Sequence, residues 1–145
     1  MNRNDLFYTC SLIEYIGRKI KLKRADVVNG LTADVVKRIY TYADVFHSEV
    51  IDKVADEFIE SAHLETGDYD NVDSCKYDVP SYWDIGEVFT RLIEDVYVDG
   101  DDVVQLILKI YNSWLTDAIS NYNSDLFYQP RDYIYECYLE NKICA

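Results

Sequence analysis

The chain has 145 residues, of which 49% are apolar and fourteen are tyrosines, so it can bury a full hydrophobic core and is not an intrinsically disordered chain. Its net charge of −13 repels polyanions, which disfavours DNA, RNA and anionic membrane surfaces as direct partners. The same charge favours a basic protein as the partner, and the alternative is that the acidic residues serve only solubility.

Apolar residues at helical spacing predict two helical regions near the start of the chain. A helix over residues 5–20 would bury an apolar stripe and run into a basic cluster at 18–24, where cations complement the helix dipole. The stop signal Asn29-Gly30 limits the next helical piece to about 24–28. Thr32 can then cap a helix that ends between residues 42 and 46. The stripe of the first helix consists of Leu6, Cys10, Leu12, Ile13, Ile16 and Ile20.

The middle of the chain contains one further helix and the least regular segment. Ser48 can cap a helix that runs to about Ala62. Its apolar face has i, i+3, i+4 spacing and consists of Val50, Ile51, Val54, Phe58 and Ile59. Residues 63–80 are rich in Asp and Asn and end in a proline, so we expect a loop. A loop of this length in a small domain is often functional.

Capping signals predict the next two helices. Ser81 and Asp84 match a capping box, which would start a helix that ends near Val96. The acidic turn at 99–102 would end that helix and cap another, because acids in a first turn complement the helix dipole. We expect this later helix to extend to about Tyr122.

After a second loop over 121–129, Pro130 suits the first position of a last helix. Its inner face would hold Tyr133, Ile134, Cys137 and Tyr138. No strand alternation of useful length occurs. The sequence therefore predicts an all-α fold, a compact bundle of about five longer helices and one or two short ones, in one domain over residues 1–145.

Charge and tyrosine content differ between the two parts of the chain. Residues 1–62 carry nine basic and ten acidic side chains, whereas residues 63–145 carry five basic and seventeen acidic ones. Most of the tyrosines also lie in the acidic part, and tyrosine offers a large contact area at low entropic cost. We therefore expect a partner-binding surface that includes Tyr69, Asp70, Asp73, Tyr77, Tyr82, Trp83, Asp99, Asp101 and Asp102. The alternative is that these tyrosines are half-buried helix residues and that Trp83 belongs to the core.

Motifs for metal binding and catalysis are missing from the sequence. A calcium loop starting at Asp68 would need a glycine at Asp73 and a glutamate at Val79. His47 and His63 do not have zinc-binding spacing. The sequence also has no nucleophile elbow and no glycine-rich phosphate loop. We therefore expect no metal, no cofactor and no enzymatic activity, and keep an enzyme without a recognisable motif as an alternative.

A DNA-binding regulator is a further alternative, because the basic segment 18–38 could form a helix-turn-helix. Its recognition helix would present Lys37 and Arg38, although Asp34 and Asp44 lie on or beside it. The overall negative charge opposes this interpretation unless the two parts of the chain are well separated in space.

The cysteines and the N-terminus suggest a reducing compartment. Cys10, Cys75, Cys137 and Cys144 form no C-x-x-C pair, so we expect free thiols. Residues 1–5 are polar and unlike a secretory signal, and no apolar run is long enough to cross a bilayer. These features predict a cytoplasmic protein without membrane association.

The sequences ADVFH at 43–47 and KVADEFI at 53–59 resemble small uncharacterised all-α bacterial proteins associated with toxin–antitoxin or phage-defence loci. The resemblance covers 12–59, about the first third of the chain, and transfers no functional residue. It implies a neutralising or regulatory partner protein. Together with the charge, it predicts a non-enzymatic protein that inhibits or regulates a basic, nucleic-acid-handling partner, with carboxylates placed where phosphates normally bind.

Overall fold

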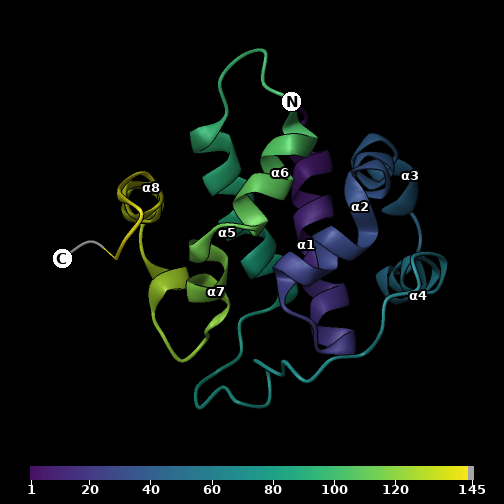
Figure 1. The fold of residues 1–145 in the computed structure, drawn as a ribbon, viewed down its shortest axis with the longest axis horizontal. Coiled ribbons are helices and arrows are strands. Elements are labelled where there is room, and N and C mark those ends of the chain that lie inside the picture. The colour runs from purple at the N-terminus through teal and green to yellow at the C-terminus, as the bar shows by residue number, and fades with distance from the viewer. Residues whose placement is uncertain (144–145) are drawn as a thin grey trace.

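The chain forms eight α-helices and one short 3-10 helix over the residues that the structure describes, 1–143 (Figure 1). This computed structural model has no strand within that range, so the predicted all-α fold is confirmed. The elements are α1 (Arg3–Ile20), α2 (Arg24–Thr41), α3 (Ala43–Phe46), α4 (Ile51–Ser61), α5 (Tyr82–Val96), α6 (Val103–Tyr111), α7 (Trp114–Ser120), η1 (Leu126–Tyr128) and α8 (Arg131–Glu140).

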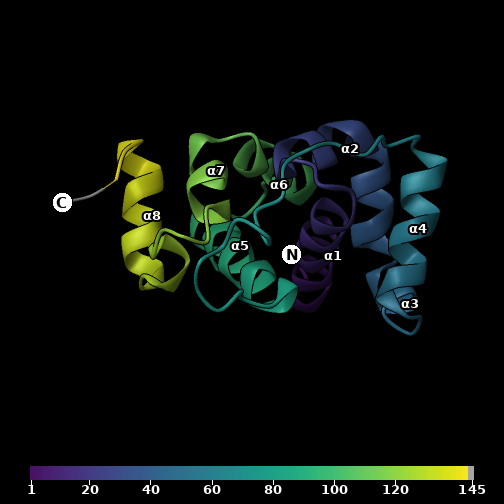
Figure 2. The same cartoon turned by 90° about the horizontal axis from the view of Figure 1, so that it is seen from below.

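Helix α1 lies in the middle of the molecule because its apolar residues are buried on more than one side. It packs against α5 on one flank and against α2 and α4 on another. Figure 1 and Figure 2 both place α4 and α8 at opposite ends of the long axis. The stripe predicted for this helix is fully confirmed, since all six of its residues are buried. The buried apolar side chains form one cluster to which all eight α-helices contribute.

The predicted helix stop at Asn29-Gly30 is wrong. Helix α2 continues through both residues, and the break comes at Thr32, where φ is 78° and ψ is 160°. Gly30 packs closely against Leu64, since a Cβ there would lie 2.5 Å from Cδ2 of that side chain. Asn29 exchanges side-chain hydrogen bonds with Asn112, at 2.8 and 3.0 Å. Tertiary contacts therefore override the local stop signal.

The predicted start of the fourth helix is also wrong. The hydroxyl of Ser48 does not cap α4 and instead donates to the carbonyl of Val45 at 2.7 Å, which closes a turn after α3. Helix α4 begins three residues later, at Ile51. Val50, expected on its buried face, precedes the helix and is 72% exposed.

The helix predicted from the acidic turn to Tyr122 is divided in two. Helix α6 ends at Tyr111, and α7 starts at Trp114. The hydroxyls of Ser113 and Thr116 both donate to the carbonyl of Ile110, at 2.6 and 2.8 Å. Side chains that take up helical carbonyls in this way compete with continuation of the helix.

Other predicted boundaries agree with the structure. The capping box of Ser81 and Asp84 is present at the start of α5. The carboxylate of Asp102 caps α6 by accepting from the backbone N–H groups of Val104 and Gln105. Pro130 lies one residue earlier than predicted, immediately before α8 rather than inside it. The predicted loop over 63–80 is confirmed, since no helix occurs between Ser61 and Tyr82.

None of the helices over residues 1–143 combines the length and the apolar character that a transmembrane span requires.

Candidate functional site

A buried ion pair joins α1 to the start of α2. Both Glu14 and Arg24 are fully buried. The guanidinium of Arg24 donates from Nε and Nη2 to the two oxygens of Glu14, each at 2.9 Å, and from Nη1 to the carbonyl of Leu22 at 2.7 Å. Only glycine at position 17 leaves room for this side chain, because a Cβ there would lie 2.4 Å from Cδ of Arg24. The pair has the bidentate geometry that makes arginine–carboxylate contacts strong.

Two further side chains bind the same carboxylate. Arg18 donates from Nε to Oε2 of Glu14 at 2.9 Å, and the hydroxyl of Tyr122 donates to the same oxygen. From Nη2, Arg18 also donates to the hydroxyl of Tyr122 at 3.0 Å and to the carbonyl of Pro80 at 2.8 Å. The cluster therefore ties the segment before α5 and the segment after α7 to α1.

The electrostatics of the cluster hold Glu14 in its charged form. Burial alone would raise the pKa of Glu14, but the charge and hydrogen bonds of Arg24, with those of Arg18 and Tyr122, lower that pKa to about 2. Burial, and then the negative charge of Glu14, raise the pKa of Tyr122, so this phenol keeps its proton and can donate it. Glu14 does not line either of the two surface hollows described below. Its contacts instead join buried parts of the fold.

Asn71 connects this cluster to the long loop. Its Oδ1 accepts from Nη2 of Arg24 at 3.0 Å, and its Nδ2 donates to the carbonyl of Ser120 at 2.9 Å. The N–H groups of Gly67 and Tyr69 donate to the carbonyls of Ile20 and Lys21 at the C-terminal end of α1, at 2.8 and 2.9 Å. Although it lacks secondary structure, the 62–81 loop is thus fastened at several points to buried partners.

The 62–81 loop and the 121–129 loop lie side by side and form one surface. The N–H of Lys76 donates to Oδ1 of Asn123 at 2.7 Å, and Nδ2 of Asn123 donates to the carbonyl of Ser74 at 2.9 Å. Two hollows of about 480 and 550 Å³ lie along this seam and share Tyr122. Ligand pockets have volumes of this order. We call the two hollows together the acidic groove.

The acidic groove combines carboxylates with exposed aromatic rings. Its tyrosines Tyr77 and Tyr128 are 70% and 76% exposed, and the ring of Tyr128 contacts Phe127 at a centroid distance of 4.4 Å. Its only lining cation among the described residues is Lys23. Its acidic lining residues are Asp68, Asp70, Asp78, Asp117 and Asp125. The surface is therefore negatively charged and presents two large ring faces to solvent.

Four of the residues predicted to bind a partner lie in or beside this groove. Tyr69 and Asp70 line one hollow, and Tyr77 lines the other. Asp73 is exposed beside them, and its N–H donates to the carboxylate of Asp70 at 2.9 Å. That hydrogen bond, and the ammonium of Lys21 at 3.7 Å, help to lower the pKa of Asp70.

The other five predicted residues lie elsewhere. Tyr82 and Trp83 are half-buried, and their rings contact those of Tyr15 and Phe7 on α1. The acidic turn at 99–102 follows the C-terminal end of α5 (Figure 1). The length of α5, at 1.5 Å per residue, separates it by roughly 20 Å from Tyr82 at the start of that helix. In the acidic turn, Asp99, Asp101 and Asp102 are exposed, and the carboxylate of Asp101 accepts from the N–H of Val98 at 2.9 Å.

Several groove residues were missed by the sequence analysis. Asp125 and Tyr128 lie in the second loop, which has no unusual length, and Asp117 lies on α7 shortly before it. Glu14 carries a clearer signal, because it is an acid within the buried stripe of the first helix. Such an acid requires a buried cation as its partner.

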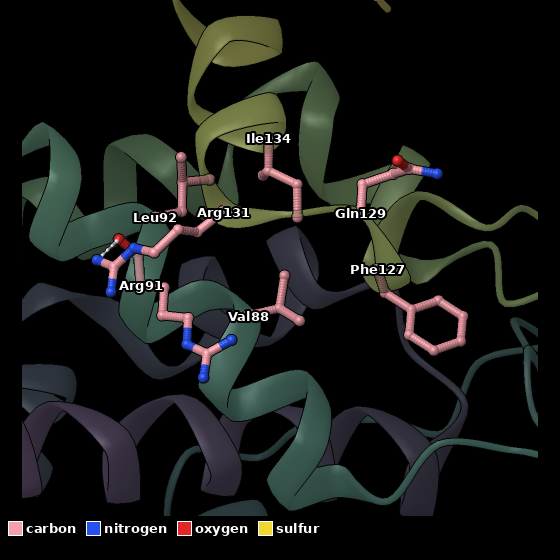
Figure 3. Close-up of a pocket in the computed structure, with 7 residues that line it drawn as sticks. All are labelled: Val88, Arg91, Leu92, Phe127, Gln129, Arg131 and Ile134. Carbon is pink, nitrogen blue, oxygen red and sulfur yellow. Dashed lines mark hydrogen bonds between the residues drawn. The ribbon is translucent and has the colours of Figure 1, made fainter.

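A smaller cavity lies between α5 and the segment that leads into α8 (Figure 3). Leu92 and Ile134 approach each other there, and Nη2 of Arg131 donates to the carbonyl of Arg91 at 3.3 Å. The cavity volume is about 20 Å³, which suffices for one water molecule. The cavity is a small gap where α8 and the segment before it pack against α5.

The basic cluster at 18–24 does not present a free cationic face. Arg18 and Arg24 bind Glu14, and Lys19 pairs with Asp52 and Asp56 at 2.7 and 2.6 Å. Lys21 pairs with Asp70, as noted above. Within residues 1–143, Lys23 is the member of this cluster without an ion pair, and its Nζ lies 6.0 Å from the centroid of the Tyr69 ring.

The described residues hold no group of three or more histidines, cysteines or acids placed to bind a metal ion. Cys10 and Cys75 are free thiols, as predicted, and Cys137 is buried, whereas Cys144 lies outside the described residues.

No protein-family model matches the sequence, and no curated protein or solved structure is significantly similar to it.

Proposed function

We propose that this protein is a non-enzymatic binding protein that captures a basic protein in the acidic groove and thereby inhibits or regulates it. The observation that carries the proposal is that Tyr77 and Tyr128, two strongly exposed rings from different loops, line one hollow together with Asp78 and Asp125. Tyrosine anchors and a surrounding charge complementary to the partner are typical of protein interfaces.

The buried cluster supports the proposal because it holds both loops in place before any partner arrives. Asn71 and Tyr122 belong to the buried cluster and also line the groove. A surface that is ordered in advance loses less conformational entropy on binding. A partner that handles nucleic acid fits best, since the carboxylates of Asp68 and Asp117 would occupy positions that such a partner reserves for phosphates.

The test is affinity capture from a host lysate at low salt, with the wild type and two variants processed side by side. The groove variant combines Asp78→Asn, Asp125→Asn and Tyr128→Ser. The control variant, Asp99→Asn with Asp101→Asn, removes the same number of charges from the opposite end of α5. We expect a basic protein that is retained by the wild type and by the control variant, and lost from the groove variant.

The captured partner then allows a quantitative measurement by surface plasmon resonance. We expect the Asp substitutions mainly to slow association and to reduce its salt dependence, and Tyr128→Ser mainly to speed dissociation, at a cost of about 1–2 kcal/mol. Equal loss of binding in the groove and control variants would contradict the proposal, because net charge alone would then explain the interaction.

A further inference from the structure

An aromatic cavity distinct from the acidic groove lies between the first turns of α1, the α3 segment and the start of α5. It has a volume of about 510 Å³. Four rings line it, and they form a continuous series. The ring of Trp83 lies 5.4 Å from that of Phe7 and 6.1 Å from that of His47, which in turn lies 5.3 Å from the ring of Tyr8.

Two carboxylates line the same cavity without a cation to balance them. Neither Asp5 nor Asp44 forms an ion pair with any residue in 1–143. Arg3, on the same turn of α1 as Asp5, is already paired with Glu87 and Glu94 on α5. Partial burial, and then the negative charge of Asp44, raise the pKa of Asp5, which means that the two acids repel each other.

A buried polar atom at the same place has no protein partner. Tyr8 is only 2% exposed, yet its hydroxyl makes no hydrogen bond in the described structure. The hydroxyl oxygen is closed to solvent, so Tyr8 contributes to the cavity lining without offering that oxygen to a ligand. Burial, and then the charge of Glu49, raise the pKa of Tyr8 to about 12, so the hydroxyl remains a donor.

We propose that this cavity binds an alkylated ammonium group, held against the rings of Trp83, Phe7 and Tyr8 and neutralised by Asp5 and Asp44. Cations over aromatic faces are attracted by the ring quadrupole, and tryptophan provides the strongest face. An alkylated ammonium suits a half-buried aromatic site better than a primary one, because its charge is less strongly hydrated. This site does not depend on the proposed capture of a basic protein.

Titration with choline tests the proposal, and its uncharged isostere with carbon in place of nitrogen is the matched control. Trp114→Phe leaves Trp83 as the only tryptophan, so its fluorescence reports on the cavity itself. We expect saturable quenching by choline and by tetramethylammonium, and none by the uncharged isostere or by sodium chloride at equal concentration. An identical response to choline and to its isostere would overturn the proposal. The proposal would also be overturned if neither ammonium ion, nor the peptides described below, gave saturable binding.

Calorimetry on variants locates the site. Trp83→Ala should weaken binding about tenfold or more, and Asp44→Asn about three- to tenfold. Asp44 is exposed, and asparagine can keep its hydrogen bond to the N–H of Val45, so this variant retains the fold even if Trp83→Ala does not. Asp34→Asn, which removes an exposed charge from α2, should leave binding unchanged. Unchanged affinity in Asp44→Asn would overturn the proposal.

The same chemistry can come from a free metabolite or from a methylated lysine of another protein. Two peptides that differ only in trimethylation of one lysine distinguish these sources. Tighter binding of choline assigns the cavity to a small molecule, and tighter binding of the trimethylated peptide assigns it to a modified protein. Equal binding of the methylated and unmethylated peptides, together with no response to choline, would overturn the proposal.

Discussion

The 62–81 loop and the 97–102 loop are both acidic and lie at opposite ends of α5. Their carboxylates differ in whether they line a groove or accept hydrogen bonds from nearby backbone. In the longer loop, buried Asn71 and the carbonyls of α1 hold the backbone, which leaves Asp68 and Asp78 free to line a groove. In the shorter loop, the carboxylates of Asp101 and Asp102 accept hydrogen bonds from the nearby N–H groups of Val98 and Val104. Acidic composition alone therefore does not distinguish a binding surface from a turn.

The comparison also shows where the order of a loop originates. The longer loop depends on a charged cluster in the interior, and the shorter one depends on its local sequence. Damage to the interior cluster should therefore loosen the longer loop and its groove, while the shorter loop and the cap of α6 stay intact.

The largest effect is expected for Glu14→Gln. The change leaves Arg24 and Arg18 in the interior without their counter-charge, which should lower the free energy of unfolding by about 3–5 kcal/mol. Urea denaturation measures this loss, with the exposed Glu57→Gln as the control. Hydrogen exchange should show loss of protection in the 62–81 loop before the 97–102 loop. An equal loss of hydrogen-exchange protection in both loops would contradict the claim that only the longer loop depends on the buried cluster.

Acid should act through the same residue. Because folding lowers the pKa of Glu14 from its ordinary value of 4.5 to about 2, the stabilisation is fully present above pH 4.5 and is lost as the pH falls toward 2. The shift corresponds to about 3 kcal/mol of unfolding free energy. Urea denaturation at a series of pH values measures it. The Glu14→Gln variant should lack this part of the pH dependence, and an unchanged acid profile in that variant would contradict the assignment.

Asn71→Ala tests the link between the cluster and the groove. It removes one of the two acceptors of Arg24 Nη2 and the side-chain donor to the carbonyl of Ser120, so we expect a loss of about 1–3 kcal/mol in unfolding free energy. Binding of the captured basic partner should weaken as well, because the groove would no longer be ordered in advance. Asp73→Ala, at an exposed position in the same loop, should not destabilise the fold.

The smallest effect is expected at the other loop. Asp102→Ala removes the acceptor for two N–H groups at the start of α6, which should lower the free energy of unfolding by about 1 kcal/mol. Thermal denaturation measures the change. Binding in the acidic groove should be the same as in the wild type, and a loss of affinity would show that both acidic loops contribute to one surface.

Local patterns determined most of the secondary structure. The stripe of α1, the capping box before α5, the Asp102 cap and the long loop all follow from residues within a few positions of one another, where side-chain spacing and backbone hydrogen bonds decide the outcome. At the failed stop signal Asn29-Gly30, the side chain of Asn29 contacts that of Asn112, which lies 83 residues away in the sequence. No local pattern contains that contact.

The sequence by itself therefore determined that the chain is helical, acidic and tyrosine-rich after residue 62, and which residues can begin its helices. Only the tertiary structure decided which acids share a surface. It placed Asp125 and Tyr128 beside Tyr77, separated them from Asp99, and paired Glu14 with Arg24 in the interior. The physical reason is that a binding surface is defined by distance in space, which the packing of α1 against α5 and the buried ion pair establish together.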